Sequence, residues 1–167
     1  GLGNISSRAL DTLSTTAKRA SIAMGGLGAA LGGKSLKEAG TFETNLANIN
    51  TLLRVSQEEI NAFGKDIQKL SLTVPVDQSL LNEATYDVIS AGITDTGDAL
   101  KTLESSAKLG VAGLGSTKES VDIVTSALNA FQLPASDAEK VAGIFFNTVE
   151  KGKNTVADIA VGFGQVA

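Results

Sequence analysis

The chain contains no cysteine, no histidine and no tryptophan, and only two prolines and one tyrosine among its 167 residues. Without cysteine there is no disulfide framework, no thiolate metal site and no thiol nucleophile. Without histidine there is no Ser-His relay and no imidazole ligand for zinc. Hydrophobic residues still make up 43% of the chain, which is enough to build a core for one domain or a little more.

Positive charge is also scarce. The chain has 14 Lys and Arg against 18 Asp and Glu, a net charge of −4, and its basic residues are scattered. A broad phosphate-binding surface needs clustered Lys and Arg. We therefore expect no specific nucleic-acid binding.

Long hydrophobic runs are missing as well. No uncharged stretch is longer than residues 20–33, which are rich in glycine and are shorter than the roughly 20 apolar residues that a membrane-spanning helix needs. The chain opens on Gly1 and stops at Ala167 inside an apolar pattern. We therefore expect it to be a piece of a longer protein.

Apolar residues recur every three or four positions along nearly the whole chain, and no strict alternation lasts long enough to indicate a strand. This pattern predicts an all-α fold of about six to eight amphipathic helices, joined by short Gly/Ser/Pro connectors, with no sheet. The apolar stripes run over residues 5–24, 39–70, 81–91, 100–111, 121–131, 141–149 and 156–166.

The stripe over residues 39–70 allows two interpretations, because only Ser56 interrupts it. One is a single long helix with a coiled-coil seam. The other is two helices, the second beginning after Ser56. Ser56 and Glu59 have the spacing of a capping box, in which the hydroxyl accepts a hydrogen bond from a free backbone N–H and the carboxylate reaches back to another. This favours two helices.

Similar start and stop signals border the other stripes. Capping boxes are predicted for the pairs Ser35/Glu38, Ser116/Glu119, Ser136/Glu139 and, in a weaker form, Thr155/Asp158. Helix ends are predicted at Gly92, at Gly113 and Gly115, before Pro134, and at Gly152 as a left-handed residue.

The composition suggests two regions and a modest core. Residues 1–33 are expected to form an N-terminal helix and a glycine-rich connector, and residues 34–167 a helical region that the chain end truncates. Six phenylalanines and one tyrosine supply the aromatic bulk, so small residues must line many helix contacts and bury little area each. We expect an isolated copy to be only modestly stable, with partners or self-association supplying further burial.

One motif suggests nucleotide chemistry. The segment from Gly28 through Gly33 and Lys34 to Ser35 matches the phosphate-loop pattern G-x-x-x-x-G-K-[ST], in which backbone N–H groups and the lysine hold phosphates and the hydroxyl holds Mg²⁺. The motif requires a preceding buried strand, whereas the residues before Gly28 have a helical pattern. We interpret it as a chance match in a connector, with Ser35 capping the next helix.

Other candidate residues are weaker. Glu58 and Glu59 are adjacent and point in different directions on a helix, and the helix dipole explains acids in a first turn. Tyr86 is predicted to be a core ring with its hydroxyl at the edge, and Phe145 and Phe146 to be core with partial exposure. We predict no catalytic residue, no cofactor and no metal site.

Several segments resemble a known family. Residues 84–93 (ATYDVISAGI), 103–107 (LESSA) and 124–131 (VTSALNAF) resemble the core region of phage tail tape-measure proteins. Residues 137–142 and 155–163 are similar in type to the helices that follow in that family. The resemblance covers about residues 40–167.

The resemblance implies a structural virion component rather than an enzyme. Such a protein sets the length of the tail tube, occupies its lumen or the tail tip, and is assembled in the host cytoplasm. It also implies a homo-oligomer, a trimer or hexamer, that contacts tail-tip or baseplate proteins, helps genome delivery and makes transient membrane contact during ejection. Two alternatives stay open: a membrane-active helical module using residues 20–33, and a phosphate-loop NTPase using Lys34.

Overall fold

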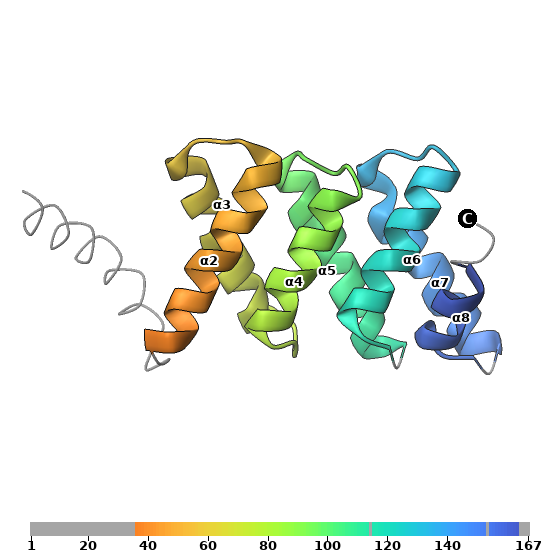
Figure 1. Cartoon of the computed structure of the whole chain (residues 1–167). Coiled ribbons are helices and arrows are strands. Elements are labelled where there is room, and N and C mark those ends of the chain that lie inside the picture. The colour runs from red at the N-terminus through yellow and green to blue at the C-terminus, as the bar shows by residue number, and fades with distance from the viewer. Residues whose placement is uncertain (1–35, 114, 153, 164–167) are drawn as a thin grey trace, which may run out of the picture. The chain divides into compact units, whose positions relative to one another are not determined.

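The computed structural model describes residues 36–113, 115–152 and 154–163 (Figure 1). The expected N-terminal helix, the glycine-rich connector and the phosphate-loop match at Gly28, Gly33, Lys34 and Ser35 lie outside these residues. The division between residues 33 and 34 therefore stays a prediction.

The described residues form seven α-helices and one 3-10 turn, and within these ranges there is no strand. The all-α prediction is confirmed. The elements in chain order are α2 (Leu36–Leu53), α3 (Gln57–Thr73), α4 (Gln78–Ser90), α5 (Thr96–Ala112), α6 (Thr117–Ala130), η1 (Ala135–Asp137), α7 (Ala138–Gly152) and α8 (Val156–Phe163).

Ser56 separates α2 from α3, so the two-helix interpretation is correct and the single coiled-coil helix is wrong. The Ser56 hydroxyl accepts a hydrogen bond from the Glu59 N–H, and a Glu59 carboxylate oxygen accepts one from the Ser56 N–H at 2.9 Å. Arg54, just before this box, has a left-handed φ of 56°. A left-handed residue turns the chain sharply, so α3 folds back beside α2 instead of extending it.

Two further capping boxes are confirmed, those of Ser116 with Glu119 and of Thr155 with Asp158. The box predicted at Ser136 is wrong. Ser136 lies inside the 3-10 turn η1, which leads directly into α7, because Pro134 starts that turn two residues earlier. The Ser35/Glu38 box lies outside the described side chains.

Helix ends agree with most of the predicted stop signals. Gly92 has a φ of 98° just after α4, a conformation that glycine adopts without steric cost. The predicted end of α7 at Gly152 is confirmed, but the left-handed conformation is wrong, because Gly152 is the last helical residue and its φ is not positive. After α6 the chain turns at Gln132, whose φ is 52°.

The chain divides into two units, Gly1–Thr41 and Phe42–Ala167, and the helices described here lie almost wholly in the second. Within this second unit, α4 and α6 lie in one layer and α3, α5 and α7 in the other (Figure 1). Two polar contacts join α4 to α6: Lys118 Nζ donates to Asp87 Oδ2 at 2.9 Å, and Asn129 Nδ2 donates to the Ala91 carbonyl at 3.2 Å.

The helices repeat with a period of 39 residues, which the sequence analysis missed. Every buried residue of α3 is followed 39 positions later by a buried residue of α5, and every buried residue of α4 by one of α6. The N-caps keep the same spacing: Asp77, Ser116 and Thr155 in one series, Ser56 and Asp95 in the other. The second unit is therefore a tandem array of α-hairpins, in which each hairpin contacts its neighbours.

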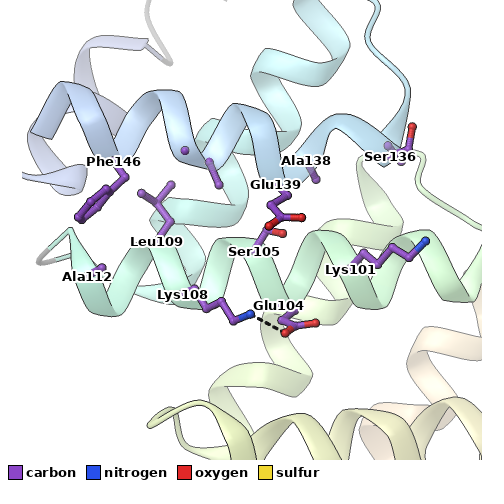
Figure 2. A pocket seen from close by; sticks show the side chains of 13 residues that line it. Lys101, Glu104, Ser105, Lys108, Leu109, Ala112, Ser136, Ala138, Glu139 and Phe146 are labelled. Carbon is purple, nitrogen blue, oxygen red and sulfur yellow. Dashed lines mark hydrogen bonds and ion pairs between the residues drawn. The ribbon is translucent and has the colours of Figure 1, made fainter.

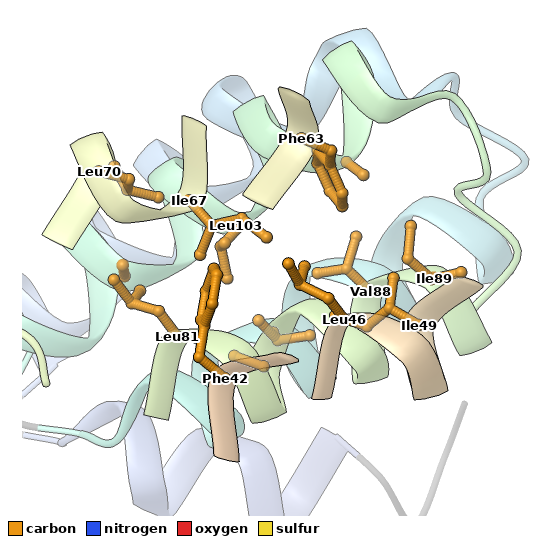
Figure 3. Packing of buried hydrophobic residues seen from close by; sticks show 14 of the residues in the cluster. Phe42, Leu46, Ile49, Phe63, Ile67, Leu70, Leu81, Val88, Ile89 and Leu103 are labelled. Atoms are coloured by element: carbon orange, nitrogen blue, oxygen red, sulfur yellow. The ribbon is translucent and has the colours of Figure 1, made fainter. Parts of the chain in front are cut away.

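The hairpins enclose two hydrophobic cores. The first lies between α2, α3, α4 and α5 (Figure 3), where Ile67, Leu81 and Leu103 are fully buried. The second lies between α5, α6, α7 and α8 and centres on Leu109, Val124 and Val156. The apolar residues that recur at helical spacing in the sequence thus pack into two successive cores along the array.

Stability should fall in acid because the capping carboxylates are hydrogen-bonded. Ser56, through its side chain and then its backbone, lowers the pKa of Glu59, and Ser116, through its backbone and then its side chain, lowers the pKa of Glu119. A group with a lowered folded pKa stabilises the fold above its unfolded pKa, here about 4.5, and loses this contribution as the pH falls through the folded pKa.

We expect the melting temperature to drop between pH 5 and pH 3, and the double variant E59Q/E119Q to show a shallower drop, because glutamine keeps the capping hydrogen bond without titrating. Thermal melts followed by circular dichroism at several pH values measure this. Equal slopes for the two proteins would contradict it.

Candidate interaction surface

A groove of about 330 Å³ lies between α5, η1 and α7 (Figure 2). Its two long walls are the exposed sides of α5 and α7, and η1 closes the space near the start of α7. The lining residues are Lys101, Glu104, Ser105, Lys108, Leu109, Ala112, Ala135, Ser136, Ala138, Glu139, Ala142, Gly143 and Phe146.

The base of the groove is apolar, and its walls carry small residues. Leu109, Ala138 and Ala142 belong to the second core and also face the groove. Phe146 and Ala112 lie at one end (Figure 2), and 37% of Phe146 is exposed. Alanine and glycine leave the space between two packed helices open, since they fill little of it.

Charged side chains lie along the α5 wall. Lys108 Nζ donates to Glu104 Oε1 at 2.7 Å, and this hydrogen bond, followed by the charge of Glu104 and, more weakly, that of Glu139, raises the pKa of Lys108. Lys101 lies at the opposite end of the groove from Phe146 (Figure 2). Lys101 makes no ion pair with any residue that the structure describes.

The 39-residue repeat explains why this junction has a groove. Leu100 and Leu103 of α5 correspond to Glu139 and Ala142 of α7. Leu103 is fully buried and Leu100 packs against the first core. One hairpin later a carboxylate and a methyl group take these positions, so the junction between α5 and α7 lacks the two leucines that the junction between α3 and α5 contains.

This surface has the features of a binding groove. An apolar base with a few polar groups on its rim is the usual composition of a site that takes an apolar side chain or a helix face. In the part of the chain that the structure describes, no group of three Asp or Glu residues is arranged to hold a metal ion. None of the helices in those ranges is long and apolar enough to cross a membrane.

The residues singled out from the sequence lie elsewhere or serve local structure. Glu59 caps α3 and Glu58 lies in its first turn. The prediction for Tyr86 as a core ring is wrong: it is 42% exposed on the outer side of α4. Phe145 packs partly against the second core and Phe146 is exposed at the groove, as predicted for this pair.

Sequence reasoning missed the groove itself. Its lining comes from α5 and α7, whose facing positions can be matched only once the 39-residue register is known. The usable signal was the change from leucine to glutamate and alanine between corresponding positions of neighbouring hairpins, Leu100 with Glu139 and Leu103 with Ala142.

The architecture defines an α-hairpin repeat protein with an apolar groove on its surface, and comparison with known proteins supplies the family. The family model for the phage-related minor tail protein matches residues 57–167. The chain belongs to this family, which supports a structural role in the phage tail and makes it a virion component.

A curated relative has a more specific description. Over 144 residues the chain is 26% identical to a probable tape measure protein of Clostridium phage phiCD119. The match covers 84% of this chain but 15% of the relative, so the chain spans a small part of the relative's length. No solved structure gives a significant match to the chain.

Proposed function

We propose that the chain is a section of a tail tape measure protein, which sets the length of the tail tube and occupies its lumen. The observation that carries this proposal is the match over 144 residues to the probable tape measure protein of Clostridium phage phiCD119. Membership in the phage-related minor tail protein family supports it, because the match extends through six consecutive α-helices, α3 to α8, and beyond the described residues.

In this role the chain acts without catalysis, as a homo-oligomer, a trimer or hexamer, beside tail-tube and tail-tip or baseplate proteins. It is assembled in the host cytoplasm and helps genome delivery. The hairpin architecture supports such a role, since a tandem array presents helix faces to its partners at regular intervals. Exposed apolar side chains along the array, such as Leu72, Phe131 and Val161, would be covered by these contacts.

Deleting one hairpin, residues 77–115, from the phage-encoded protein tests the proposal. The deletion keeps the register of caps and layers because it removes one 39-residue period. If the helices run end to end in the tube, we expect tails shorter by about 60 Å, since a helix rises about 1.5 Å per residue. If the hairpins stay stacked, we expect shortening of about 10 Å, the spacing of packed helices.

Electron micrographs of the particles measure the tail length. The control is a phage with Leu72→Ala, which changes one exposed side chain and should leave the tail length unchanged. Particles with the deletion whose tails keep the parental length would contradict the proposal that this segment contributes to the measured length.

A further inference from the structure

We propose that the groove between α5, η1 and α7 docks an amphipathic helix of another protein, with two leucine-sized side chains over Ala142 and a carboxylate beside Lys101. The proposal concerns this surface alone and does not depend on the role of the chain in tail length.

The chain itself contains the template for the occupant. At the junction between α3 and α5, Leu100 and Leu103 extend from one helix and pack into the first core. At the junction between α5 and α7 the corresponding residues are Glu139 and Ala142, and a groove of about 330 Å³ remains. Leu100 and Leu103 lie three residues apart on one helix face; Ala142 leaves open the space that Leu103 fills one hairpin earlier, while Glu139 lines the groove in place of Leu100.

A helix supplies side chains with this spacing. Residues three or four apart lie next to each other on a helix surface, and an apolar helix face laid into a groove is a recurring mode of recognition between proteins. The small residues Ala138, Ala142 and Gly143 along the α7 wall let the backbone of such a helix approach closely.

Charge fixes the orientation of the occupant. Phe146 and Ala112 make one end of the groove apolar, and Lys101 lies at the other (Figure 2). Lys108 is already paired with Glu104 and is also attracted by the charge of Glu139, whereas Lys101 has no ion-pair partner within the described ranges. A carboxylate one turn beyond the leucine pair of the bound helix would form an ion pair with Lys101.

The probe is a fluorescein-labelled, alanine-based helical peptide with two leucines three residues apart and a glutamate one turn later. Two control peptides replace the leucines by alanine or the glutamate by lysine. Fluorescence anisotropy with the complete 167-residue chain measures the affinity. We expect the first peptide to bind with a dissociation constant on the order of 10–100 µM and each control peptide at least tenfold more weakly.

Variants of the chain locate the binding. Ala142→Leu restores the leucine found one hairpin earlier and should weaken binding at least tenfold without lowering the melting temperature. Phe146→Ala removes an exposed wall and should weaken binding about fivefold, which keeps the test valid if Ala142→Leu folds poorly. Lys101→Ala should weaken binding three- to tenfold, with the difference shrinking at high salt.

Lys140 is the matched control, because it is exposed and occupies in α7 the repeat position that Lys101 occupies in α5, outside the groove lining. Lys140→Ala should leave the affinity unchanged. Failure of the leucine peptide to bind at millimolar concentration, or equal binding by the native chain and by Phe146→Ala, would overturn the proposal. So would self-association in sedimentation experiments that Ala142→Leu abolishes, because the occupant would then be a second copy of the chain.

Discussion

Replacing Leu103 with alanine is expected to lower the free energy of unfolding by about 3–4 kcal/mol, the usual range for a leucine deleted from a tight core. Leu103 is fully buried in the first core, where it lies among Ile67, Leu81 and Val88 (Figure 3). Its position at the junction of α3, α4 and α5 means that the cavity would be bordered by three helices, which cannot all close it at once.

Urea denaturation followed by circular dichroism measures this change. Leu72→Ala is the matched control: the same atoms are removed from a side chain that is 83% exposed, and we expect less than about 0.5 kcal/mol. A loss below about 1 kcal/mol for Leu103→Ala would contradict the packing described for the first core.

The second large effect is expected for Gly113→Ala at the end of α5. A Cβ at this position would collide with Cγ2 of Val156 and would lie 2.9 Å from the Leu109 carbonyl oxygen. Val156 is fully buried there, and its N–H donates to the Gly113 carbonyl at 3.0 Å. Neither the Val156 side chain nor the Leu109 carbonyl group can move away without losing contacts. We therefore expect a destabilisation of about 1–3 kcal/mol, as for other overpacked sites.

A double-mutant cycle isolates the cause. Val156→Ala removes the side chain that the new methyl group would meet, so the double variant should be more stable than the sum of the single changes predicts, by about 0.5–2 kcal/mol. Gly143→Ala is the control, because a Cβ there meets nothing within 4 Å. That change should stabilise α7 by about 0.5–1 kcal/mol. Additive effects at Gly113 and Val156 would show that their close approach does not cause the loss.

Local signals in the sequence predicted the helices well, because they depend on residues close together in the chain. Ser56 with Glu59 and Ser116 with Glu119 form their capping boxes within a single turn, and Gly92 turns the chain on its own. Two local predictions are wrong: the cap at Ser136 and the left-handed conformation of Gly152. Pro134 starts a 3-10 turn before Ser136 can act as a cap, and the helical conformation continues through Gly152.

The repeat was not predicted from the sequence, because buried positions recur every 39 residues whereas the residue types at those positions change. Leu81 corresponds to Ser120, and Asn82 to Val121, yet all four are buried. A period hidden in this way becomes visible only when the buried side of each helix is known. Tyr86 shows the same limit: its aromatic ring suggested a core position, but α4 turns it outward because Leu81, Ala84 and Val88 occupy the inner face.

The amino-acid sequence by itself determined that this protein is helical, where most helices begin and end, and that it resembles tail tape-measure proteins. These properties follow from periodicity, capping and turn residues that act over a few positions. Only the tertiary structure decided the 39-residue hairpin register, the close approach of Gly113 to Val156, and the groove beside Ala142. Each of these depends on side chains that are distant in the chain and are brought together by packing, and the free energy of that packing depends on the fit between them rather than on either residue alone.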